Sequence, residues 1–377
     1  MYTNVVFIAM SGGVDSSVAA YLLKEEGYQV HGVTMRLYDS YEKSYSCGQS
    51  IPLANAVAEK LNIPFHAIDM RDEFKANVVE KFINQYEKGL TPNPCIICNK
   101  TIKFGELFEF ITHKLRNSEI SDYDILNPED FNTDNHPMIA TGHYAIIEQN
   151  KNGRYMLRKS NDLSKDQSYF LYTLTQEILS RTVFPLGRLS SKDEVRRIAD
   201  EQGFVNAKVK DSQDVCFIPD GKYSEFINSY TGKEYTPGNF VDINGRILGT
   251  HKGIINYTIG QRKGLGISLG KPMYVYRLDI KNNSVILAED SDLYETKLIA
   301  DNMNWVSIEE PKVGDRRHAL GRIRYRHAEA PCTVTMLEGG KAEVVFDEPQ
   351  RAITPGQSIV FYDIATDSYV LGGGIIQ

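Results

Sequence analysis

Short apolar segments alternate with helix-like patterns through the first part of the chain. Residues 5–10 (VVFIAM) form a continuous apolar run, which is typical of a strand buried on both faces. Apolar residues then recur every fourth position over 14–22, as on one face of a helix, and Gly27 is placed to cap its end. Residues 29–35 (QVHGVTM) predict the next strand. Together these segments predict a βαβ unit with parallel strands.

The alternation then repeats. It predicts a helix over 50–61, a strand over 64–70, a helix over 72–88, and a further strand with its turn over 137–147. Helical patterns continue from about 168 to 202. Strands that alternate with helices indicate a doubly wound parallel sheet with helices on both faces.

The pattern changes beyond about residue 220. Residues 238–253 (GNFVDINGRILGTHKG) contain an Asn-Gly hairpin signal, and short alternating segments with regular glycines follow. Residues 330–346 and 357–363 predict strands of a small barrel or sandwich. A chain of 377 residues favours two or three domains. We expect an α/β catalytic domain over 1–218, a small central domain over 219–284 and a β-barrel over 285–377.

Composition narrows the class of protein. At 42% hydrophobic and 24% charged residues the chain is ordinary for a globular protein, and no apolar run approaches the roughly 18 residues that span a bilayer. The N-terminus carries no basic leader. Five cysteines are too few for a disulfide scaffold, and we expect Cys47 and Cys332 to be structural. These features predict a cytoplasmic protein without a membrane partner.

The charge is unevenly distributed. A net charge of −7 argues weakly against nucleic acid, yet residues 311–327 carry six basic side chains against one acid. This stretch is either a basic face that steers a polyanion or an ordinary solvated strand pair.

The stretch SGGVDSS at 11–17 carries the first candidate chemistry. A glycine-rich turn between a strand and a helix presents backbone N–H groups and the positive end of a helix dipole to an anion. Serine hydroxyls add donors, but the lysine of the usual nucleotide-hydrolase loop is missing. Asp15 lies inside the loop instead, which is reasonable if Mg²⁺ bridges it to phosphates.

This loop resembles that of the ATP-pyrophosphatase superfamily, whose fold is the adenine nucleotide α-hydrolase type. The resemblance implies cleavage of ATP between the α and β phosphates, adenylation of a carbonyl-type oxygen, and a loop that holds the leaving pyrophosphate. A nucleophile such as ammonia, an amine or sulfur then replaces the activated oxygen.

Three cysteines are candidates for a sulfur route. Cys95 and Cys98 lie in TPNPCIICNKTIKF (91–104), a loop stiffened by prolines, and Cys216 lies in KDSQDVCFIP (210–219). A lone C-x-x-C has several ordinary explanations, and Cys216 is equally compatible with a buried structural thiol.

Essentially the whole chain is similar to the tRNA-specific 2-thiouridylase family. The matching segments are AMSGGVDSSVAAYLL, TPNP..ICNKTIKF, ATGHYA, KDQSYFLYTL, PLG, KVKDSQDVCFIP, YTIGQRKGLGI, RIRYRH, VVFDEPQRAITPGQSIVFY and LGGGII, in that order. The resemblance implies ATP-dependent thiolation at carbon 2 of the wobble uridine of tRNA.

The resemblance also implies roles. Cys216 carries a persulfide delivered by a donor such as a cysteine desulfurase or a relay protein, and Cys98 is the nucleophile or resolving partner that leaves a Cys98–Cys216 disulfide. Predicted ATP contacts are Ala9, Met10, Ser11, Gly12, Gly13, Val14, Asp15, Ser16, Met35 and Gly142. Predicted tRNA contacts are Asn93, Pro94, Cys95, His143, Lys165, Asp166, Gln167, Arg324, Tyr325 and Gln357.

One position departs from the family pattern. Many members carry an aspartate, thought to be a base near the target uridine, where this chain has Cys95. Cys95 either takes over that role as a thiolate, or joins Cys98 and Cys216 as three ligands of a 4Fe–4S cluster with one iron free to carry sulfide. Zinc lacks an evident fourth ligand.

Two other functions compete. One is a different pyrophosphate-loop ligase that forms an amide or attaches an amine to tRNA, which needs no cysteine pair. The other is a tRNA-binding module with a vestigial ATP loop, against which the intact Asp15, glycines and serines argue.

Overall fold

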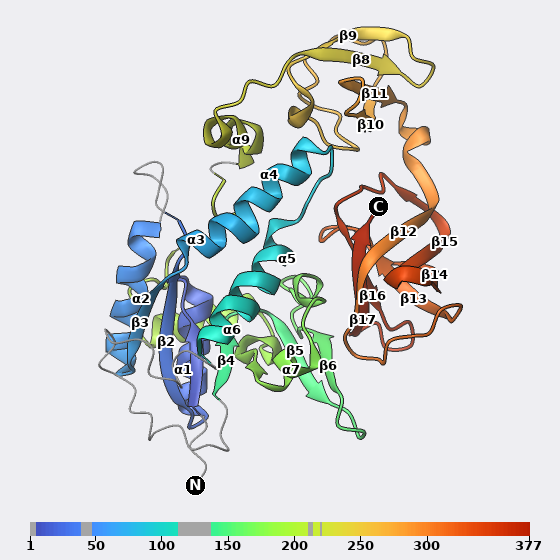
Figure 1. Ribbon diagram of the computed structural model, residues 1–377. Helices are drawn as coiled ribbons and strands as arrows, with labels where there is room; N and C mark the ends of the chain where they lie inside the picture. Colours follow the sequence, from blue (N-terminus) through green and yellow to red (C-terminus); the bar gives the residue numbers. More distant parts are fainter. Residues whose placement is uncertain (1–4, 39–46, 112–136, 210–213, 219–220) are drawn as a thin grey trace.

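The computed structural model describes residues 5–38, 47–111, 137–209, 214–218 and 221–377. These residues form an α/β part, a small β-rich part at the top of Figure 1 and a C-terminal barrel. No helix within those ranges is long and apolar enough to cross a membrane.

Five parallel strands form the sheet of the α/β part. In spatial order they are β3 (Phe65–Asp69), β2 (Gln29–Arg36), β1 (Val5–Ala9), β4 (Met138–Thr141) and β7 (Thr182–Val183). The strands predicted at 5–10, 29–35 and 64–70 match β1, β2 and β3. Strand β1 is short and apolar because packed side chains cover both of its faces, whereas Ala67 and Asp69 of the edge strand β3 are exposed.

Helices flank this sheet. They are α1 (Val14–Glu25), α2 (Cys47–Leu61), α3 (Arg71–Phe74), α4 (Glu80–Glu87), α5 (Pro94–Cys98), α6 (Leu107–Glu109), α7 (Gln176–Ser180) and α8 (Lys192–Glu201). π-helical segments at Lys75–Val79 and Asn99–Glu106 join α3 to α4 and α5 to α6. The helix predicted over 72–88 is therefore present, with a π-helical turn inside it.

Strand β1 shows that the sheet is covered on both sides. Val6 and Ile8 join the core that contains the buried faces of α1, α2 and α8. Val5 and Phe7 face the other core, which contains apolar residues from α3 to α6. Successive side chains of a strand point to opposite faces of its sheet, so the predicted doubly wound sheet is confirmed.

The helical patterns predicted over 168–202 correspond to several short helical segments separated by breaks. The segment contains a 3₁₀ turn at Ser168–Leu171, then α7, β7, a second 3₁₀ turn at Pro185–Arg188, and finally α8. Pro185 accounts for one break, because the residue before a proline avoids helical backbone and Phe184 has a ψ of 87°. Spacing of apolar residues alone did not reveal these breaks.

The β-rich part follows α9 (Tyr223–Thr231). Its sheet has the order β10 (Tyr274–Asp279), β11 (Ser284–Ala288), β8 (Gly238–Asp242) and β9 (Ile247–His251), and a 3₁₀ turn covers Ile254–Asn256. The predicted Asn-Gly hairpin joins β8 to β9, with Gly245 at a φ of +84° that favours glycine.

The last six strands close into a barrel. They are β12 (Tyr294–Trp305), β13 (Arg316–Arg322), β14 (Ala330–Leu337), β15 (Lys341–Arg351), β16 (Ser358–Tyr362) and β17 (Tyr369–Ile376), with 3₁₀ turns at Asp290–Leu293 and Glu338–Gly340. Strand β12 pairs with both β15 and β17, which completes the ring. Of the two expected forms, the barrel is therefore the one present, and it has its own apolar core.

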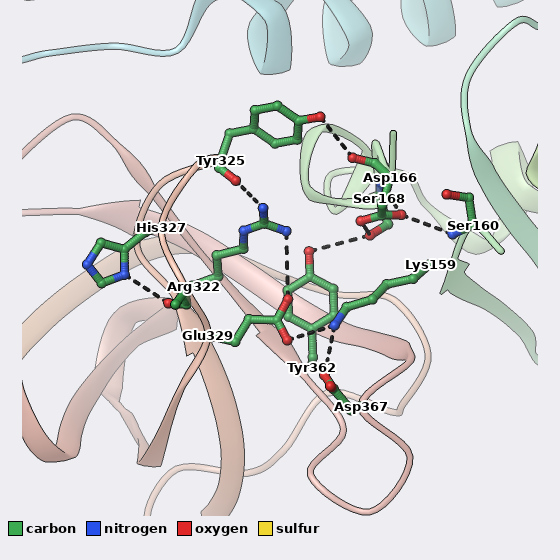
Figure 2. A network of polar contacts seen from close by, with 11 residues as sticks. Lys159, Ser160, Asp166, Ser168, Arg322, Tyr325, His327, Glu329, Tyr362 and Asp367 are labelled. Carbon is green, nitrogen blue, oxygen red and sulfur yellow. Dashed lines mark hydrogen bonds and ion pairs between the residues drawn. The ribbon is translucent and has the colours of Figure 1, made fainter. Parts of the chain in front are cut away.

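The barrel is joined to the α/β part by a shared sheet. Strand β5 (Ala145–Gln149), which the sequence placed within the α/β alternation, forms a hairpin with β6 (Tyr155–Lys159), and β6 pairs with β17 of the barrel. Figure 2 shows Lys159 at this junction, where its Nζ lies 2.7 Å from carboxylate oxygens of both Glu329 and Asp367. The two parts therefore share main-chain and charged contacts.

Candidate functional site

The glycine-rich loop lies between β1 and α1, as predicted. Gly12 has a φ of +75°, and a Cβ there would lie 2.6 Å from the carbonyl oxygen of Ser50 in α2. Gly13 is the N-cap residue and has no side chain to cap the first N–H groups of α1. Backbone N–H groups at such a helix start bind anions.

Hydroxyl groups shape the loop itself. Ser16 Oγ and Ser17 Oγ both donate to the carbonyl oxygen of Gly13, at 3.1 and 3.0 Å. The Asn206 amide, fully buried, donates to the Gly12 carbonyl oxygen at 2.8 Å and to Ser17 Oγ at 2.9 Å. We expected these serines to donate to a ligand, but their hydroxyl protons are used within the loop, so the backbone N–H groups remain the main anion donors.

Asp15 has two buried partners. Tyr144 Oη donates to Asp15 Oδ1 at 2.5 Å, and Lys192 Nζ lies 2.5 Å from the same oxygen. Tyr144 and Lys192 are 3% and 7% exposed, so the ammonium group is withdrawn from water and needs a charged partner. The loop that has no lysine of its own therefore receives one from α8.

The other predicted ATP contacts surround this loop. Ala9, Met10 and Val14 lie where β1 leads into the loop and α1. Gly142 follows β4, and a Cβ there would lie 2.9 Å from the backbone N of Ser16, so a side chain would push into the start of α1. Met35 is half-buried near the end of β2. The carboxyl ends of β1, β2 and β4 thus meet at the loop, where parallel sheets bind ligands.

Cys95 and Cys98 lie on a helix. The sequence suggested a loop, but Pro94 occupies the first turn of α5, and Asn93 Oδ1 accepts the backbone N–H groups of Cys95 and Ile96 at 3.1 and 3.4 Å. Proline at the start and asparagine at the N-cap are both favourable for a helix. Cys95 is exposed and Cys98 is buried.

Cys216 is held against the same side of the sheet. Its carbonyl oxygen accepts the Tyr38 hydroxyl at 2.6 Å. The next residue, Phe217, stacks edge-on against Phe74 of α3 and Phe82 of α4, with ring centres 5.5 and 5.6 Å apart. Phe217 and Cys98 belong to one apolar core.

The three thiols are electrostatic neighbours. Burial raises the pKa of Cys98 to about 11, and the Cys95 thiol adds to the rise. Burial raises the pKa of Cys216 to about 12, followed by the nearby Cys98 and Cys95 thiols. Burial also raises the pKa of Cys95. Cys216 is nevertheless exposed as a residue, so part of it is accessible while its sulfur atom is crowded by neighbouring groups.

One cation opposes these shifts. Lys103 lowers the pKa of Cys95, Cys98 and Cys216. It lies five residues after Cys98, within the π-helical segment Asn99–Glu106. Bonding from i to i+5 brings residues five apart onto one face, and π-helical segments are common at functional sites.

The donor set does not fit a metal cluster as it is arranged. Over the described residues, no three His, Cys, Asp or Glu side chains are grouped as a metal ion requires. The three cysteines are close enough to influence one another's pKa, but they do not form such a group.

His143 links the two halves of the site. Its Nδ1 lies 2.7 Å from Thr141 Oγ1, and its ring contacts those of Phe104 and Phe184, with centres 6.1 and 5.9 Å apart. Burial, and then the charge of Lys103, lower the pKa of His143 well below its usual range. The ring is therefore neutral, next to Gly142, whose backbone lies against the start of α1, and beside the π-helical segment that follows Cys98.

Most of the other predicted tRNA residues have partners within the protein. Asp166 is buried and its carboxylate accepts the Ser168 hydroxyl at 2.8 Å (Figure 2). Gln167 Oε1 accepts the N–H of Tyr144 at 3.0 Å, while Lys165 is half-buried. Gln167 thus supports Tyr144, which binds Asp15, and contact of these residues with tRNA stays a prediction.

The barrel residues also connect parts of the protein. Tyr325 Oη donates to the carbonyl oxygen of Asp166 at 3.1 Å, and Gln357 Nε2 donates to that of Thr91 at 2.8 Å. Arg324 Nη2 donates to a carbonyl oxygen within the barrel. The barrel thus contacts the segment that leads into the cysteine helix.

Sequence reasoning missed Lys192, Lys103, Tyr144 and Asn206. Lys192 had a readable signal: it follows the N-cap Ser191 as the first residue of α8, where the helix dipole disfavours a positive charge. Tyr144 and Asn206 gave no signal, because their partners Asp15 and Gly12 are more than a hundred residues away in the sequence. Lys103 became a candidate only through the π-helical turn that places it near Cys98.

Fold and loop together define a nucleotide-binding protein of the HUP class. The family model described as "tRNA methyl transferase HUP domain" matches residues 4–220. Models described as "tRNA methyl transferase PRC-barrel domain" and "Aminomethyltransferase beta-barrel domain" match residues 224–289 and 295–376.

Curated relatives narrow the class. A tRNA-specific 2-thiouridylase MnmA of Lachnoclostridium phytofermentans is 44% identical over 98% of this chain and 99% of its own. Those of Caldanaerobacter subterraneus (MnmA 2) and Acetivibrio thermocellus are each 46% identical over 99% of this chain, and over 98% and 99% of their own lengths. The chain belongs to the tRNA-specific 2-thiouridylase family.

Proposed function

We propose that this chain replaces the 2-oxygen of the wobble uridine of tRNA with sulfur, at the expense of ATP, as a tRNA-uridine 2-sulfurtransferase of the cytoplasm. The observation that carries the proposal is the meeting of Cys98 and Cys216, far apart in sequence, on one side of a sheet whose strand ends carry a pyrophosphate-type loop. Its relatives are named for this modification.

The first step is adenylation. The uridine 2-oxygen attacks the α-phosphorus, the bond to the β-phosphate breaks, and pyrophosphate leaves within the loop at the start of α1. Asp15 is suited to hold Mg²⁺ through its carboxylate, because this cation prefers one or two carboxylates together with substrate phosphates. When bound, Mg²⁺ neutralises charge on those phosphates.

The second step is sulfur transfer. A persulfide donor, a cysteine desulfurase or relay protein, places a sulfur atom on Cys216. The terminal sulfur attacks carbon 2, and AMP leaves with the former 2-oxygen. The Cys98 thiolate then attacks the sulfur of Cys216, which breaks the sulfur–sulfur bond to the base and leaves 2-thiouridine and a Cys98–Cys216 disulfide. Two electrons from a dithiol reductant restore the thiols.

Because the pKa values of the thiols are raised, the site must supply a cation and a base that favour the thiolate. Neutral thiols are poor nucleophiles, since the thiolate reacts. Lys103 is the cation that favours the thiolate of Cys98, and Cys95 accepts the proton as a thiolate in place of the family's acid. Both assignments are part of the proposal.

tRNA contacts are proposed for the basic face 311–327 and for Lys165, His143 and Gln357. Phosphates meeting lysine and arginine give the salt-sensitive part of affinity. The target base must leave its stack and reach the cysteine helix.

The family descriptions also name methyl transfer. Attachment of a methyl group requires neither a loop for departing pyrophosphate nor a pair of thiols. An amide-forming or amine-attaching ligase requires the loop but not the thiols. The cysteine pair therefore favours thiolation over both.

The test is mass analysis of tRNA after incubation with ATP, Mg²⁺ and a persulfide donor, alongside pyrophosphate and iron assays. We expect a 16-dalton gain on one uridine, the replacement of one oxygen by sulfur, with tRNA-dependent pyrophosphate release and no bound iron. A brown protein from anaerobic purification that loses activity with its iron would support the cluster route, and a 14-dalton gain would indicate methylation.

A further inference from the structure

The ammonium group of Lys192 is unusual for its position. Lysine at the first residue of a helix opposes the helix dipole, and this one is also 7% exposed. Burial and the helix dipole both disfavour a positive charge at this side chain, so its presence indicates a local requirement for that charge. That requirement lies at the phosphate loop, because Nζ is 2.5 Å from Asp15 Oδ1.

The backbone around Lys192 is fixed before any ligand arrives. Its N–H donates to Asp162 Oδ2 at 3.1 Å, and the N-cap Ser191 Oγ accepts the N–H of Glu194 at 3.3 Å. Nζ also lies 5.8 Å from the centre of the Tyr144 ring. The side chain is therefore held over the loop, and ordering it costs little when a ligand binds.

A second buried group at the loop is incompletely satisfied. The Asn206 amide nitrogen makes both of its hydrogen bonds to the loop, while Asn206 Oδ1 has no hydrogen-bond partner among the described residues. Buried polar atoms of this kind are normally paired. Asn206 thus fixes the backbone of Gly12 and the side chain of Ser17 beneath the loop, so the loop keeps its shape without a ligand.

We propose that Lys192 supplies the cation that the loop lacks and binds the β- and γ-phosphates of ATP, which leave as pyrophosphate. This rests on the proposed function, because only cleavage between the α and β phosphates makes pyrophosphate the leaving group. Asp15 holds the ammonium in the free protein. With ATP bound, the ammonium of Lys192 would contact the phosphates, and Asp15 would be the carboxylate that could hold Mg²⁺, as the lysine of ordinary nucleotide-hydrolase loops contacts phosphates from within the loop.

The experiment compares pyrophosphate with AMP. Full-length protein and its Lys192→Met and Lys192→Arg variants are titrated calorimetrically with Mg-pyrophosphate and, separately, with AMP, without tRNA or sulfur donor. We expect Lys192→Met to weaken pyrophosphate binding about 10- to 100-fold, the value of one charge-assisted hydrogen bond, and AMP binding less than about twofold. Lys192→Arg recovers part of the pyrophosphate affinity. Lys81→Met, an exposed lysine of α4, is the matched control and binds both ligands normally.

The outcomes separate the possibilities. Unchanged pyrophosphate binding in Lys192→Met overturns the proposal, as does equal weakening of AMP and pyrophosphate, which indicates a structural role. Selective loss of pyrophosphate affinity supports it even if no thiolated tRNA is ever found, because this readout does not involve tRNA or sulfur.

Discussion

The phosphate end and the sulfur end of the site differ in how complete they are. At the phosphate end, Asp15 bonds to Lys192 of α8 and to Tyr144, which follows β4. Asn206 bonds to the Gly12 carbonyl oxygen, so the anion-binding loop is already in position. At the sulfur end, Cys98 and Cys216 are neighbours, but their raised pKa values keep them protonated at neutral pH. One end is ready for its ligand and the other is not yet reactive.

The difference has a physical cause. A phosphate group brings its own charge, so the protein needs only to arrange N–H groups and a cation, and these are stable without the ligand. A thiolate must be created inside the protein, where burial penalises charge. The buried thiols are therefore protonated at neutral pH, and the neutral thiol is the less reactive form.

Removal of a thiol should abolish the activity of the sulfur end while that of the phosphate end continues. Cys216→Ala is expected to lower 2-thiouridine formation on the order of 10³-fold or more, because no persulfide forms, while tRNA-dependent pyrophosphate release continues. Mass analysis of the tRNA and a pyrophosphate assay measure the two activities. Cys332→Ala, a buried cysteine of the barrel, is the control and retains both. Product formation by Cys216→Ala would exclude sulfur transfer through this residue.

Alteration of the loop should have the converse effect. Gly12→Ala combines a φ of +75° with a Cβ 2.6 Å from the Ser50 carbonyl oxygen, so we expect ATP binding to fall at least about tenfold and unfolding to become easier by more than about 2 kcal/mol. Alkylation of Cys216 should be unaffected. Gly27→Ala is the matched control, since it has a φ of +87° but nothing within 4 Å, and should cost about 1–2 kcal/mol without loss of ATP binding. Similar ATP affinity in both variants would contradict this account.

The pH dependence of thiol reactivity tests the sulfur end directly. Because only the thiolate reacts, alkylation of Cys98 and Cys216 by iodoacetamide should rise about tenfold per pH unit from 7 to beyond 9, where an ordinary thiol of pKa 9.0 would already level off. Peptide mass spectrometry resolves each cysteine. Folded protein also retains protons that the unfolded chain releases between pH 9.0 and about 11, so the free energy of unfolding should fall across that window.

Lys103→Met tests the contribution of Lys103 to the alkylation rates of the same cysteines. Loss of the cation that lowers these pKa values is expected to slow alkylation at each pH by roughly threefold, the equivalent of about half a pKa unit. Lys100→Met, an exposed lysine of the same π-helical segment, provides the comparison and should have no effect. Equal rates in the two variants would remove Lys103 from the sulfur site.

The smallest effect on activity is expected for a substitution in the barrel. Arg324→Ala should weaken tRNA binding and flatten its salt dependence by about one unit of slope per lost phosphate contact, with normal ATP binding. It should also lower Tm by about 2–4 °C, because Arg324 bonds within the barrel. Arg326→Ala, an exposed neighbour, tests the salt slope without that bond. A salt slope unchanged in Arg324→Ala would argue against its contact with tRNA.

Much of the fold was readable from the sequence, for local reasons. A continuous apolar run marked β1, mixed runs between helical patterns marked β2 and β3, Gly27 and Asn244-Gly245 marked turns, and the serine- and glycine-rich loop predicted the phosphate site. The breaks between the helical segments of 168–202 could not be predicted from the spacing of apolar residues. Aromatic residues of this segment pack against the barrel rather than along a helix face. Tyr169, for example, donates to the carbonyl oxygen of Ser358 at 2.8 Å.

The residue types of the site, the order of its elements and the family of the chain could all be read from short sequence segments. Backbone preferences and motifs are encoded over a few neighbouring residues. Tertiary structure alone decided which lysine lies on Asp15, that Cys98 and Cys216 are neighbours, and that β6 extends the sheet of the barrel. Those contacts join residues more than a hundred positions apart. They depend on how whole layers pack, and no local pattern specifies that packing.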